Sequence, residues 1–330
     1  MNFCMLPISS EYVTVLEGIR EEAGDDVRIL YSQGCDLYKD KVENLAWDQD
    51  RISEAVITAE NSDVVILCVG LDETLEGEEG DTGNSDASGD KVDLHLPKVQ
   101  EELIEKVTAV GKPTIVVLMA GSAIDLNYAQ DNCNGILLAW YPGARGGRAI
   151  ADLLFGKESP SGKLPITFYK DLEGMPEFTD YSMKNRTYRY MEKEALYPFG
   201  YGLTYSDTCV TEAEVVGEVS AESDIMLKAT VKNNGTVDTD EVVQVYIKDL
   251  DSPLAVRNYS LCGFKRVSLK AGEEKSVEFT ISNKAMNIVD EDGNRYIAGK
   301  HFRLFAGVSQ PDTRSAELTG YKPAEVEIAL

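Results

Sequence analysis

Residues 63–96 constrain the fold more than any other stretch, because an apolar run stops there at a long acidic segment. Six consecutive apolar residues, Val64 to Val69, end at Gly70. A run of this length bounded by glycine is typical of a strand buried on both faces, as in a parallel sheet covered by helices. The sequence therefore predicts an α/β layer structure here, with the acidic segment leaving the carboxyl end of a strand.

The acidic segment is too long for an ordinary connection between two elements. Such connections usually run about 2–6 residues, and much longer loops commonly have a function or are disordered. Its carboxylates are separated by glycines, which permit positive φ. The candidates are Glu73, Glu76, Glu78, Glu79 and Asp81. A loop of this kind can supply a general acid or coordinate a hard cation, although composition alone favours a solvated run of like charges.

Strand and helix patterns alternate around this segment up to about residue 156. Helices are predicted within 10–24, 48–62, 97–110 and 146–154, and further strands at 27–32, 113–119 and 135–140. Residues 1–170 are therefore predicted to form an α/β domain with a mostly parallel sheet.

The pattern changes after residue 206 to short alternating strands separated by turn residues. Alternation at 225–232, 242–247 and 276–281 predicts strands with one buried face, and Asp292-Gly293 predicts a hairpin. Residues 171–206, rich in aromatics and glycines, are predicted to be an extended connector. The predicted fold class is thus α/β plus all-β, with a fibronectin type III-like β-sandwich at 207–330.

Composition argues against several classes of partner. A net charge of −25 repels nucleic acid, and the longest apolar runs are far shorter than the roughly 20 residues that span a membrane. His95 and His301 are too few and too far apart for a zinc site or a Ser-His-Asp arrangement. No cofactor or metal is expected. The six scattered cysteines, including Cys68 in the apolar run, favour reduced core thiols and a cytoplasmic location.

Two features at expected strand ends could bind a ligand but more commonly have a structural role. The glycines of PGARGG, before the helix at 146–154, lack a nucleotide-binding pattern and favour a structural turn. Trp140 and Tyr141 lie at the carboxyl end of a predicted strand. Aromatic faces there suit sugar rings, although core or rim packing is the commoner role.

Stretches from nearly the whole chain resemble glycoside hydrolase family 3, a group of retaining β-glucosidases, β-xylosidases and related hydrolases. The matching stretches, in the family's order, include SDVVILCVG, LEGEEGD, KPTIVVLMAGSAIDL, AWYPGARGGRAIADLLFG, RTYRYMEKEALYPFGYGLTYS and VDEDGNRYIAGKHFRLFAGVSQPD. The resemblance implies an α/β sandwich domain and a fibronectin-like domain, in an enzyme that begins with a TIM-like barrel. We expect the barrel and the sandwich domain's first strand to be missing here, which leaves a sheet edge exposed, as in a gene fragment, a split subunit or a mis-called start.

The resemblance also implies a catalytic role for the acidic segment. The family's nucleophile is an Asp on the barrel, and its general acid/base is a Glu on a loop of the sandwich domain. By order after the strand, that role falls to Glu76 first, with Glu78 as the alternative and Glu79 behind it. A retaining glycosidase needs two carboxyl groups about 5–5.5 Å apart. We therefore expect the chain alone to be inactive and Glu76 to be a solvated carboxylate.

The partners implied are a β-linked glucoside, xyloside or oligosaccharide and a TIM-like barrel domain, supplied in cis or in trans. Arg145, where many members carry Glu, is a variation of the xylosidase-like branch. Asn258 and Lys91 also depart from the usual Pro and Arg. Sugar selectivity would be set largely by the barrel. The alternative hypothesis is a non-catalytic carbohydrate-binding or structural module.

Overall fold

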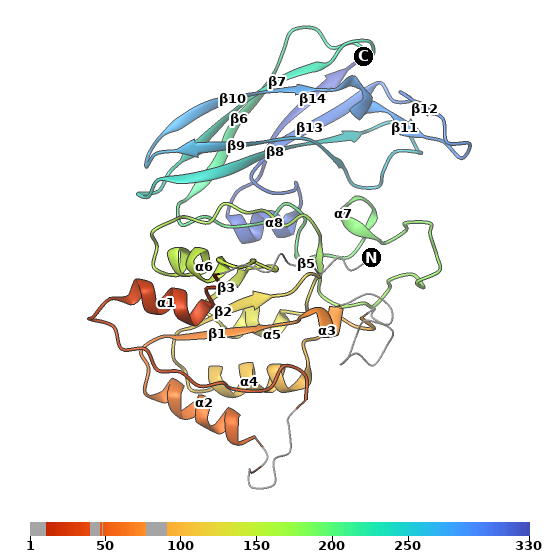
Figure 1. Ribbon diagram of the computed structural model, residues 1–330. Helices are drawn as coiled ribbons and strands as arrows, with labels where there is room; N and C mark the ends of the chain where they lie inside the picture. The colour runs from red at the N-terminus through yellow and green to blue at the C-terminus, as the bar shows by residue number, and fades with distance from the viewer. Residues whose placement is uncertain (1–10, 40–46, 48, 77–90) are drawn as a thin grey trace. The chain divides into compact units, whose positions relative to one another are not determined.

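The computed structural model describes residues 11–39, 47, 49–76 and 91–330 (Figure 1). The chain divides into two compact units. Unit 1 comprises residues 1–157 and 170–172, and unit 2 comprises residues 158–169 and 173–330. Unit 1 is built on a parallel sheet and unit 2 on antiparallel sheets, which confirms the predicted fold class.

Unit 1 is organised around a three-stranded parallel sheet. Its order is β1 (Val65–Gly70), β2 (Thr114–Met119) and β3 (Gly135–Leu138). Gly70 lies opposite Met119, and Leu118 lies opposite Leu138. This register brings the carboxyl ends of all three strands to one edge of the sheet. The three strands form where the apolar runs predict them.

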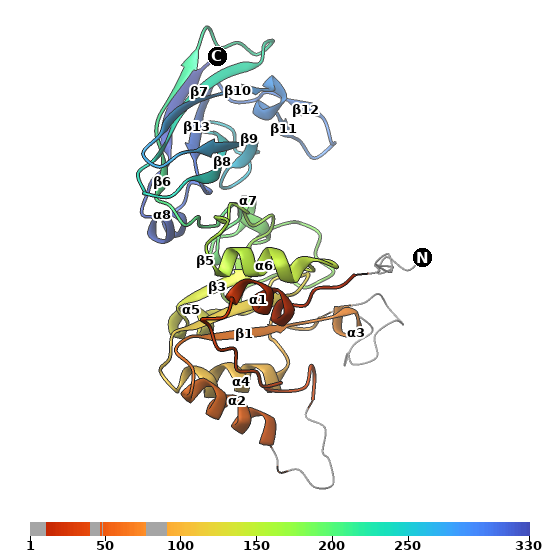
Figure 2. The ribbon, with the colours of Figure 1, turned by 60° about the vertical axis from the view of Figure 1, so that its left-hand side comes forward.

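Helices cover both faces of this sheet, as the two views in Figures 1 and 2 agree. They are α1 (Val15–Ala23) and α6 (Gly146–Leu154) on one side, and α2 (Asp50–Glu60) and α4 (Lys98–Thr108) on the other, with the short α5 (Asn127–Asn132) before β3. On the α1 side, Val15 and Ile150 pack with Val117 of β2. Helix α1 begins with a capping box between Thr14 and Glu17, whose side chains accept hydrogen bonds from backbone N–H groups at the start of the helix.

Two expectations for this unit are wrong. No strand forms at residues 27–32, where Val27 and Tyr31 are 49% and 60% exposed. A strand needs a neighbour for its backbone N–H and C=O groups, and no described strand pairs with this segment. Cys68 is exposed rather than a core thiol, because β1 pairs only with β2 among the described residues and is an edge strand.

Unit 2 contains the expected β-sandwich. One sheet has the order β10 (Glu274–Ile281), β7 (Ile225–Asn233), β6 (Thr208–Val216), and the other has the order β14 (Ala324–Ala329), β13 (His301–Gly307), β8 (Thr239–Asp249), β9 (Ser260–Leu269). Buried residues alternate along β7, and Leu227, Phe279 and Phe302 belong to one core between the sheets.

The remaining elements of unit 2 are β4 (Phe168–Tyr169), α7 (Thr187–Tyr190), β5 (Ala195–Tyr197), η1 (Asn283–Met286), β11 (Ile288–Val289), β12 (Arg295–Tyr296) and α8 (Thr313–Thr319). The β11–β12 hairpin, with Gly293 at φ +82°, confirms the Asp-Gly turn.

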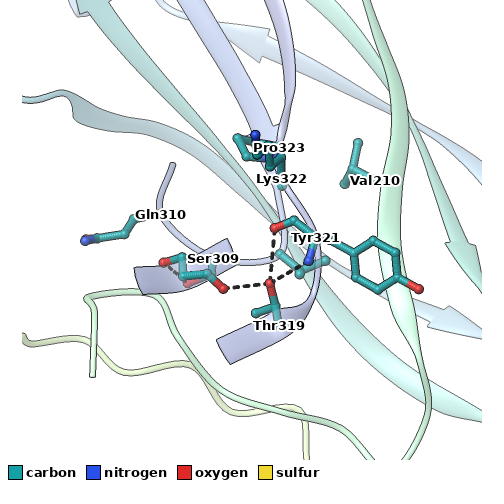
Figure 3. A pocket seen from close by; sticks show the side chains of 10 residues that line it. Val210, Ser309, Gln310, Thr319, Tyr321, Lys322 and Pro323 are labelled. Atoms are coloured by element: carbon teal, nitrogen blue, oxygen red, sulfur yellow. Dashed lines mark hydrogen bonds between the residues drawn. The ribbon is translucent and has the colours of Figure 1, made fainter. Parts of the chain in front are cut away.

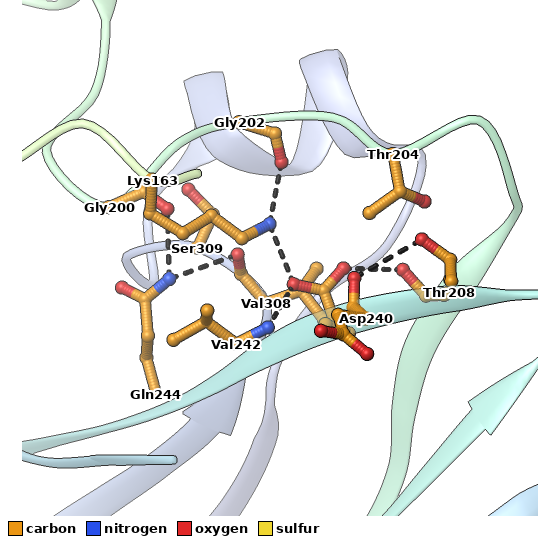
Figure 4. A network of polar contacts seen from close by, with 12 residues as sticks. Lys163, Gly200, Gly202, Thr204, Thr208, Asp240, Val242, Gln244, Val308 and Ser309 are labelled. Atoms are coloured by element: carbon orange, nitrogen blue, oxygen red, sulfur yellow. Dashed lines mark hydrogen bonds and ion pairs between the residues drawn. The ribbon is translucent and has the colours of Figure 1, made fainter. Parts of the chain in front are cut away.

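A buried ion pair ties the segment that precedes the sandwich to β8 within unit 2 (Figure 4). Lys163 Nζ lies 2.8 Å from Glu241 Oε1, and the two side chains are only 8% and 2% exposed. Lys163 also donates to the Gly202 carbonyl, and Glu241 accepts from Thr208 Oγ1 and Val242 N. Because both charges are hydrogen-bonded as well as paired, this burial is compatible with a stable fold.

Candidate functional site

The first turn of the acidic segment is fixed immediately after β1. Leu71 N donates to the Met119 carbonyl at 2.8 Å, which continues the parallel pairing by one residue. Asp72 Oδ1 then accepts from Thr74 N and Thr74 Oγ1, at 2.9 and 2.7 Å. These contacts begin the short helix α3 (Glu73–Glu76), whose Leu75 is buried. The Glu76 side chain therefore starts from a defined backbone position.

The Glu76 carboxylate reaches the carboxyl ends of the other two strands. Gly121 N, two residues beyond β2, donates to Glu76 Oε2 at 2.7 Å. The Ser122 hydroxyl donates to Oε1, and the Tyr141 hydroxyl donates to Oε2. Glu76 is half-buried. Three loops, one from the end of each strand, thus meet at a single carboxylate.

The backbone beside β3 is shaped to deliver the Tyr141 hydroxyl. Trp140 has φ +51°, which is a genuine outlier for a bulky residue and is found mostly where function or packing requires it. Gly121 allows the ring to approach, since a Cβ there would lie 2.8 Å from Tyr141 Cε2. Tyr141 remains 48% exposed. The predicted aromatic at the strand end is therefore a hydrogen-bond donor to the acidic segment with one accessible side.

Two nearby groups respond to the charge of Glu76. Burial raises the pKa of Tyr141, and the hydrogen-bonded Glu76 carboxylate raises it further, so the phenol stays a donor over the neutral range. Burial lowers the pKa of Lys91, while the charges of Glu76 and Asp93 oppose that effect. Lys91 Nζ is buried and has no hydrogen-bond partner among the described residues. The charge of Glu76 therefore influences the pKa of both neighbouring groups at this edge of the sheet.

The structure places the predicted site residues unequally. Glu76 lies at the strand edge, but the expectation that it is a solvated carboxylate is wrong, because three donors surround it. The alternatives Glu78 and Glu79 lie outside the described residues. Gly121 and Ser122 were not singled out from the sequence, although a Gly-Ser pair two residues after a buried parallel strand lies where open α/β sheets place their sites.

The glycines of PGARGG serve helix packing. A Cβ at Gly147 would lie 2.0 Å from the Thr14 carbonyl oxygen, so the start of α6 touches the backbone before α1. Arg145 Nη2 pairs with Glu11 Oε2 at 2.7 Å. This supports the structural turn over a phosphate cradle.

Other parts of the described chain offer no competing centre. A small hollow beside α8 is lined mainly by hydroxyl and apolar side chains, with no carboxylate among its lining residues (Figure 3). Within the same described ranges, no cluster of three or more His, Cys, Asp or Glu side chains is arranged to hold a metal ion. None of the helices described there has the length and apolarity required to cross a bilayer.

Known proteins match both units. The model of the glycosyl hydrolase family 3 C-terminal domain matches residues 3–205, and that of a fibronectin type III-like domain matches residues 241–310. A β-xylosidase of Formosa agariphila is 34% identical over 316 residues, covering 93% of this chain and 42% of the relative. A xylan 1,4-β-xylosidase of Xylanibacter ruminicola is 39% identical over 270 residues, covering 81% of this chain and 31% of the relative.

A solved β-glucosidase structure from Erythrobacter marinus resembles the chain with a TM-score of 0.80 at 30% identity. The match covers 97% of this chain and 43% of that one. The chain therefore spans less than half the length of each of these three proteins.

Proposed function

This chain belongs to the glycosyl hydrolase family 3 C-terminal domain family, and we propose that it carries the general acid/base of a retaining β-glycosidase. The bond hydrolysed is an O-glycosyl bond of a β-glucoside or a β-xyloside. The names of the relatives, β-xylosidases and β-glucosidases, support this substrate class. The family itself is one of glycoside hydrolases.

The reaction defines what such a residue has to do. In a retaining glycosidase one carboxylate attacks the anomeric carbon, while a second carboxyl group protonates the departing oxygen and afterwards takes a proton from water. The second group works as acid and then as base, so it has to stay in place in both protonation states.

The observation that carries the proposal is the position of Glu76. Its carboxylate lies at the carboxyl edge of a parallel sheet, where open α/β sheets commonly bind ligands. Glu76 is our first candidate for the acid/base, and Glu78 is the second. Tyr141, which donates to this carboxylate, is 48% exposed and offers an aromatic face beside it.

We propose that the nucleophile comes from a TIM-like barrel in cis or in trans, so that the chain alone does not turn over glycosides. One carboxyl group cannot perform both halves of the retaining reaction. The proposal is supported by the family's chemistry and by the longer relatives.

A complementation assay tests the proposal. The chain is mixed with a separately expressed barrel domain of a longer relative, and nitrophenyl glucosides and xylosides are assayed with each protein alone and with the mixture. We expect turnover in the mixture only. Turnover by this chain alone would overturn the claim that it needs a barrel. No turnover in any mixture that forms a complex would favour the non-catalytic module.

Variants then identify the acid/base. With Glu76→Ala we expect a loss of about 10²–10⁴-fold for substrates whose leaving group needs protonation. The loss should be smaller for activated leaving groups, and azide should restore turnover as a glycosyl azide. Glu78→Ala is the competing variant, and Glu54→Ala on the exposed face of α2 is the control. The same signature in Glu78→Ala alone would assign the role to Glu78.

A further inference from the structure

The three partners of Glu76 differ in what they are able to do. Gly121 N is a donor only, so it fixes Oε2 as an acceptor in every state. The partners at Ser122 and Tyr141 are hydroxyls, which both donate and accept. The group formed by Gly121 N, the Ser122 hydroxyl and the Tyr141 hydroxyl is called the Glu76 cradle below.

We propose that Ser122 and Tyr141 are positioning residues that hold the Glu76 carboxyl in place in both its ionised and its protonated state. The inference rests on the proposed acid/base role of Glu76. It explains how the carboxyl group keeps its position while it gains and loses a proton during the reaction. It concerns residues that do not need to touch the reacting atoms.

The contacts in the structure suit the ionised state. Oε2 accepts from Gly121 N and Tyr141, and Oε1 accepts from Ser122. Three donors and no acceptor complement a carboxylate that has four lone-pair sites. Among the described contacts Oε1 has one donor and Oε2 has two, so we place the proton of an attacking water on Oε1.

The protonated state needs only one change. When Oε1 gains the proton from water, the water oxygen bonds to the anomeric carbon. The bond between that carbon and the nucleophile's oxygen breaks. The new O–H on Oε1 donates to Ser122 Oγ, whose own hydroxyl turns away. Oε2 keeps both of its donors, so the carboxyl does not move. In the next cycle the glycosidic oxygen replaces Ser122 Oγ as acceptor. It takes the proton as its bond to the anomeric carbon breaks and the nucleophile's oxygen bonds to that carbon.

The charged groups around the cradle do not compete for these positions. Lys91 and Asp72 act on Glu76 and Tyr141 through their charges, without a hydrogen bond to either one among the described contacts. Asp72 Oδ1 is already occupied by Thr74. The cradle is therefore the only described hydrogen-bonded link between the Glu76 side chain and β2 and β3.

The test measures amide hydrogen exchange in α3 of the full chain, and needs no turnover. Leu75 N and Glu76 N donate to the Asp72 carbonyl at 3.0 and 2.9 Å, so their exchange reports whether this turn is held. Glu76→Ala removes the acceptor, and we expect exchange to accelerate on the order of tenfold. Glu76→Gln mimics the protonated carboxyl, since its amide N–H donates to Ser122 while its oxygen accepts. We expect its exchange to stay within about twofold of wild type.

Ser122 supplies the decisive contrast. Ser122→Thr keeps a hydroxyl and Ser122→Ala removes it, so exchange in the Thr variant should lie closer to wild type. The double variant Glu76→Gln/Ser122→Ala should exchange faster than either single variant. Tyr128→Phe is the matched control, because it removes a hydroxyl bonded to Thr108 Oγ1 at 3.0 Å in the same unit and should leave α3 unchanged.

Each outcome decides the proposal. Equal exchange in Glu76→Ala and wild type would overturn the cradle, and equal exchange in Glu76→Gln and Glu76→Ala would overturn the protonated half. If Glu76→Ala does not fold, as read by Trp fluorescence, equal exchange in the two Ser122 variants would refute the role of Ser122. The variants could show the expected exchange rates while Glu76→Ala, mixed with the barrel domain, retains full turnover. That result would support the cradle and reject Glu76 as the acid/base.

Discussion

The Tyr141 hydroxyl donates a hydrogen bond to the Glu76 carboxylate, joining residues 65 positions apart in the chain. Glu76 ends the first helical turn after β1, and Tyr141 lies in the turn after β3. The contact is made at the edge where the parallel strands end together. The start of the acidic segment is thus anchored by tertiary contacts rather than by its own sequence.

The first prediction concerns the ionisation of Tyr141. Burial is the main cause of its raised pKa, and the Glu76 carboxylate adds to it. Glu76→Gln removes the negative neighbour and leaves most of the burial, so we expect the pKa of Tyr141 to fall toward its ordinary value. NMR titration of ¹³C-labelled tyrosine measures it. Glu73→Gln, on the exposed side of the same helix, is the control, and an unchanged Tyr141 titration in Glu76→Gln would contradict the contact.

The sequence predicts part of this site because parallel strands have a recognisable apolar pattern. It locates the acidic segment at a strand end and the aromatic pair at another. It does not identify Ser122 as a partner of Glu76, since that requires the register in which Gly70 lies opposite Met119. Register follows from side-chain packing across the whole sheet, which local patterns do not contain.

The fold, like the site, has elements that the sequence predicts and features that depend on how the strands pair. Apolar runs predict β1, β2 and β3, and alternation predicts β7, β8 and β10, because burial on two faces or one dictates these patterns. Residues 27–32 have a suitable composition but no described neighbour to pair with. Cys68 is exposed for a related reason, since an edge strand is not covered as a central strand is. Pairing is a property of the assembled sheet.

The second prediction concerns His95 and pH. The hydrogen bond from His95 Nδ1 to Glu101 Oε1, at 2.9 Å, is the main cause of the raised pKa of His95, with Asp125 and Asp93 adding to it. A folded pKa above the unfolded one gives stability that is fully present below about pH 6.5 and is lost as pH rises through the folded pKa. Solvent screening keeps the effect small, because His95 is 56% exposed.

Urea unfolding at pH 5.5 and pH 8.5 measures this contribution. We expect the midpoint to change less between the two pH values in His95→Asn than in wild type. Glu101→Gln keeps the histidine but removes its main partner, and should flatten the difference similarly. Identical pH dependence in all three proteins would rule out the contact as a source of stability.

The third prediction concerns the buried pair of Lys163 and Glu241. Lys163→Met leaves a carboxylate buried without its counter-charge, and we expect the free energy of unfolding of unit 2 to fall by about 3–5 kcal/mol. The double variant Lys163→Met/Glu241→Leu should recover much of that loss, because no charge is then buried. Hydrogen exchange of β8 amides measures the stability of this unit. A double variant as unstable as the single one would show that the loss comes from packing rather than from charge.

The last prediction concerns the contact of α1 with α6, which holds the helical layer over the sheet. A Cβ at Gly147 would lie 2.0 Å from the Thr14 carbonyl oxygen, and one at Gly18 would lie 2.1 Å from the Gly147 carbonyl oxygen. Both obstacles are backbone atoms, so a methyl group has to push the helices apart. We expect Gly147→Ala to lower the free energy of unfolding of unit 1 by about 1–3 kcal/mol.

The chain provides its own probe and control for this variant. Both tryptophans, Trp47 and Trp140, lie in unit 1, so tryptophan fluorescence during urea unfolding reports on that unit. Gly135→Ala is the matched control, because its nearest heavy atoms are Ile115 side-chain carbons at 3.8 Å, an ordinary contact distance. We expect that variant to stay within about 0.5 kcal/mol of wild type. Equal midpoints for the two variants would mean that the helices separate without cost, and the close contact would then not be what requires glycine at position 147.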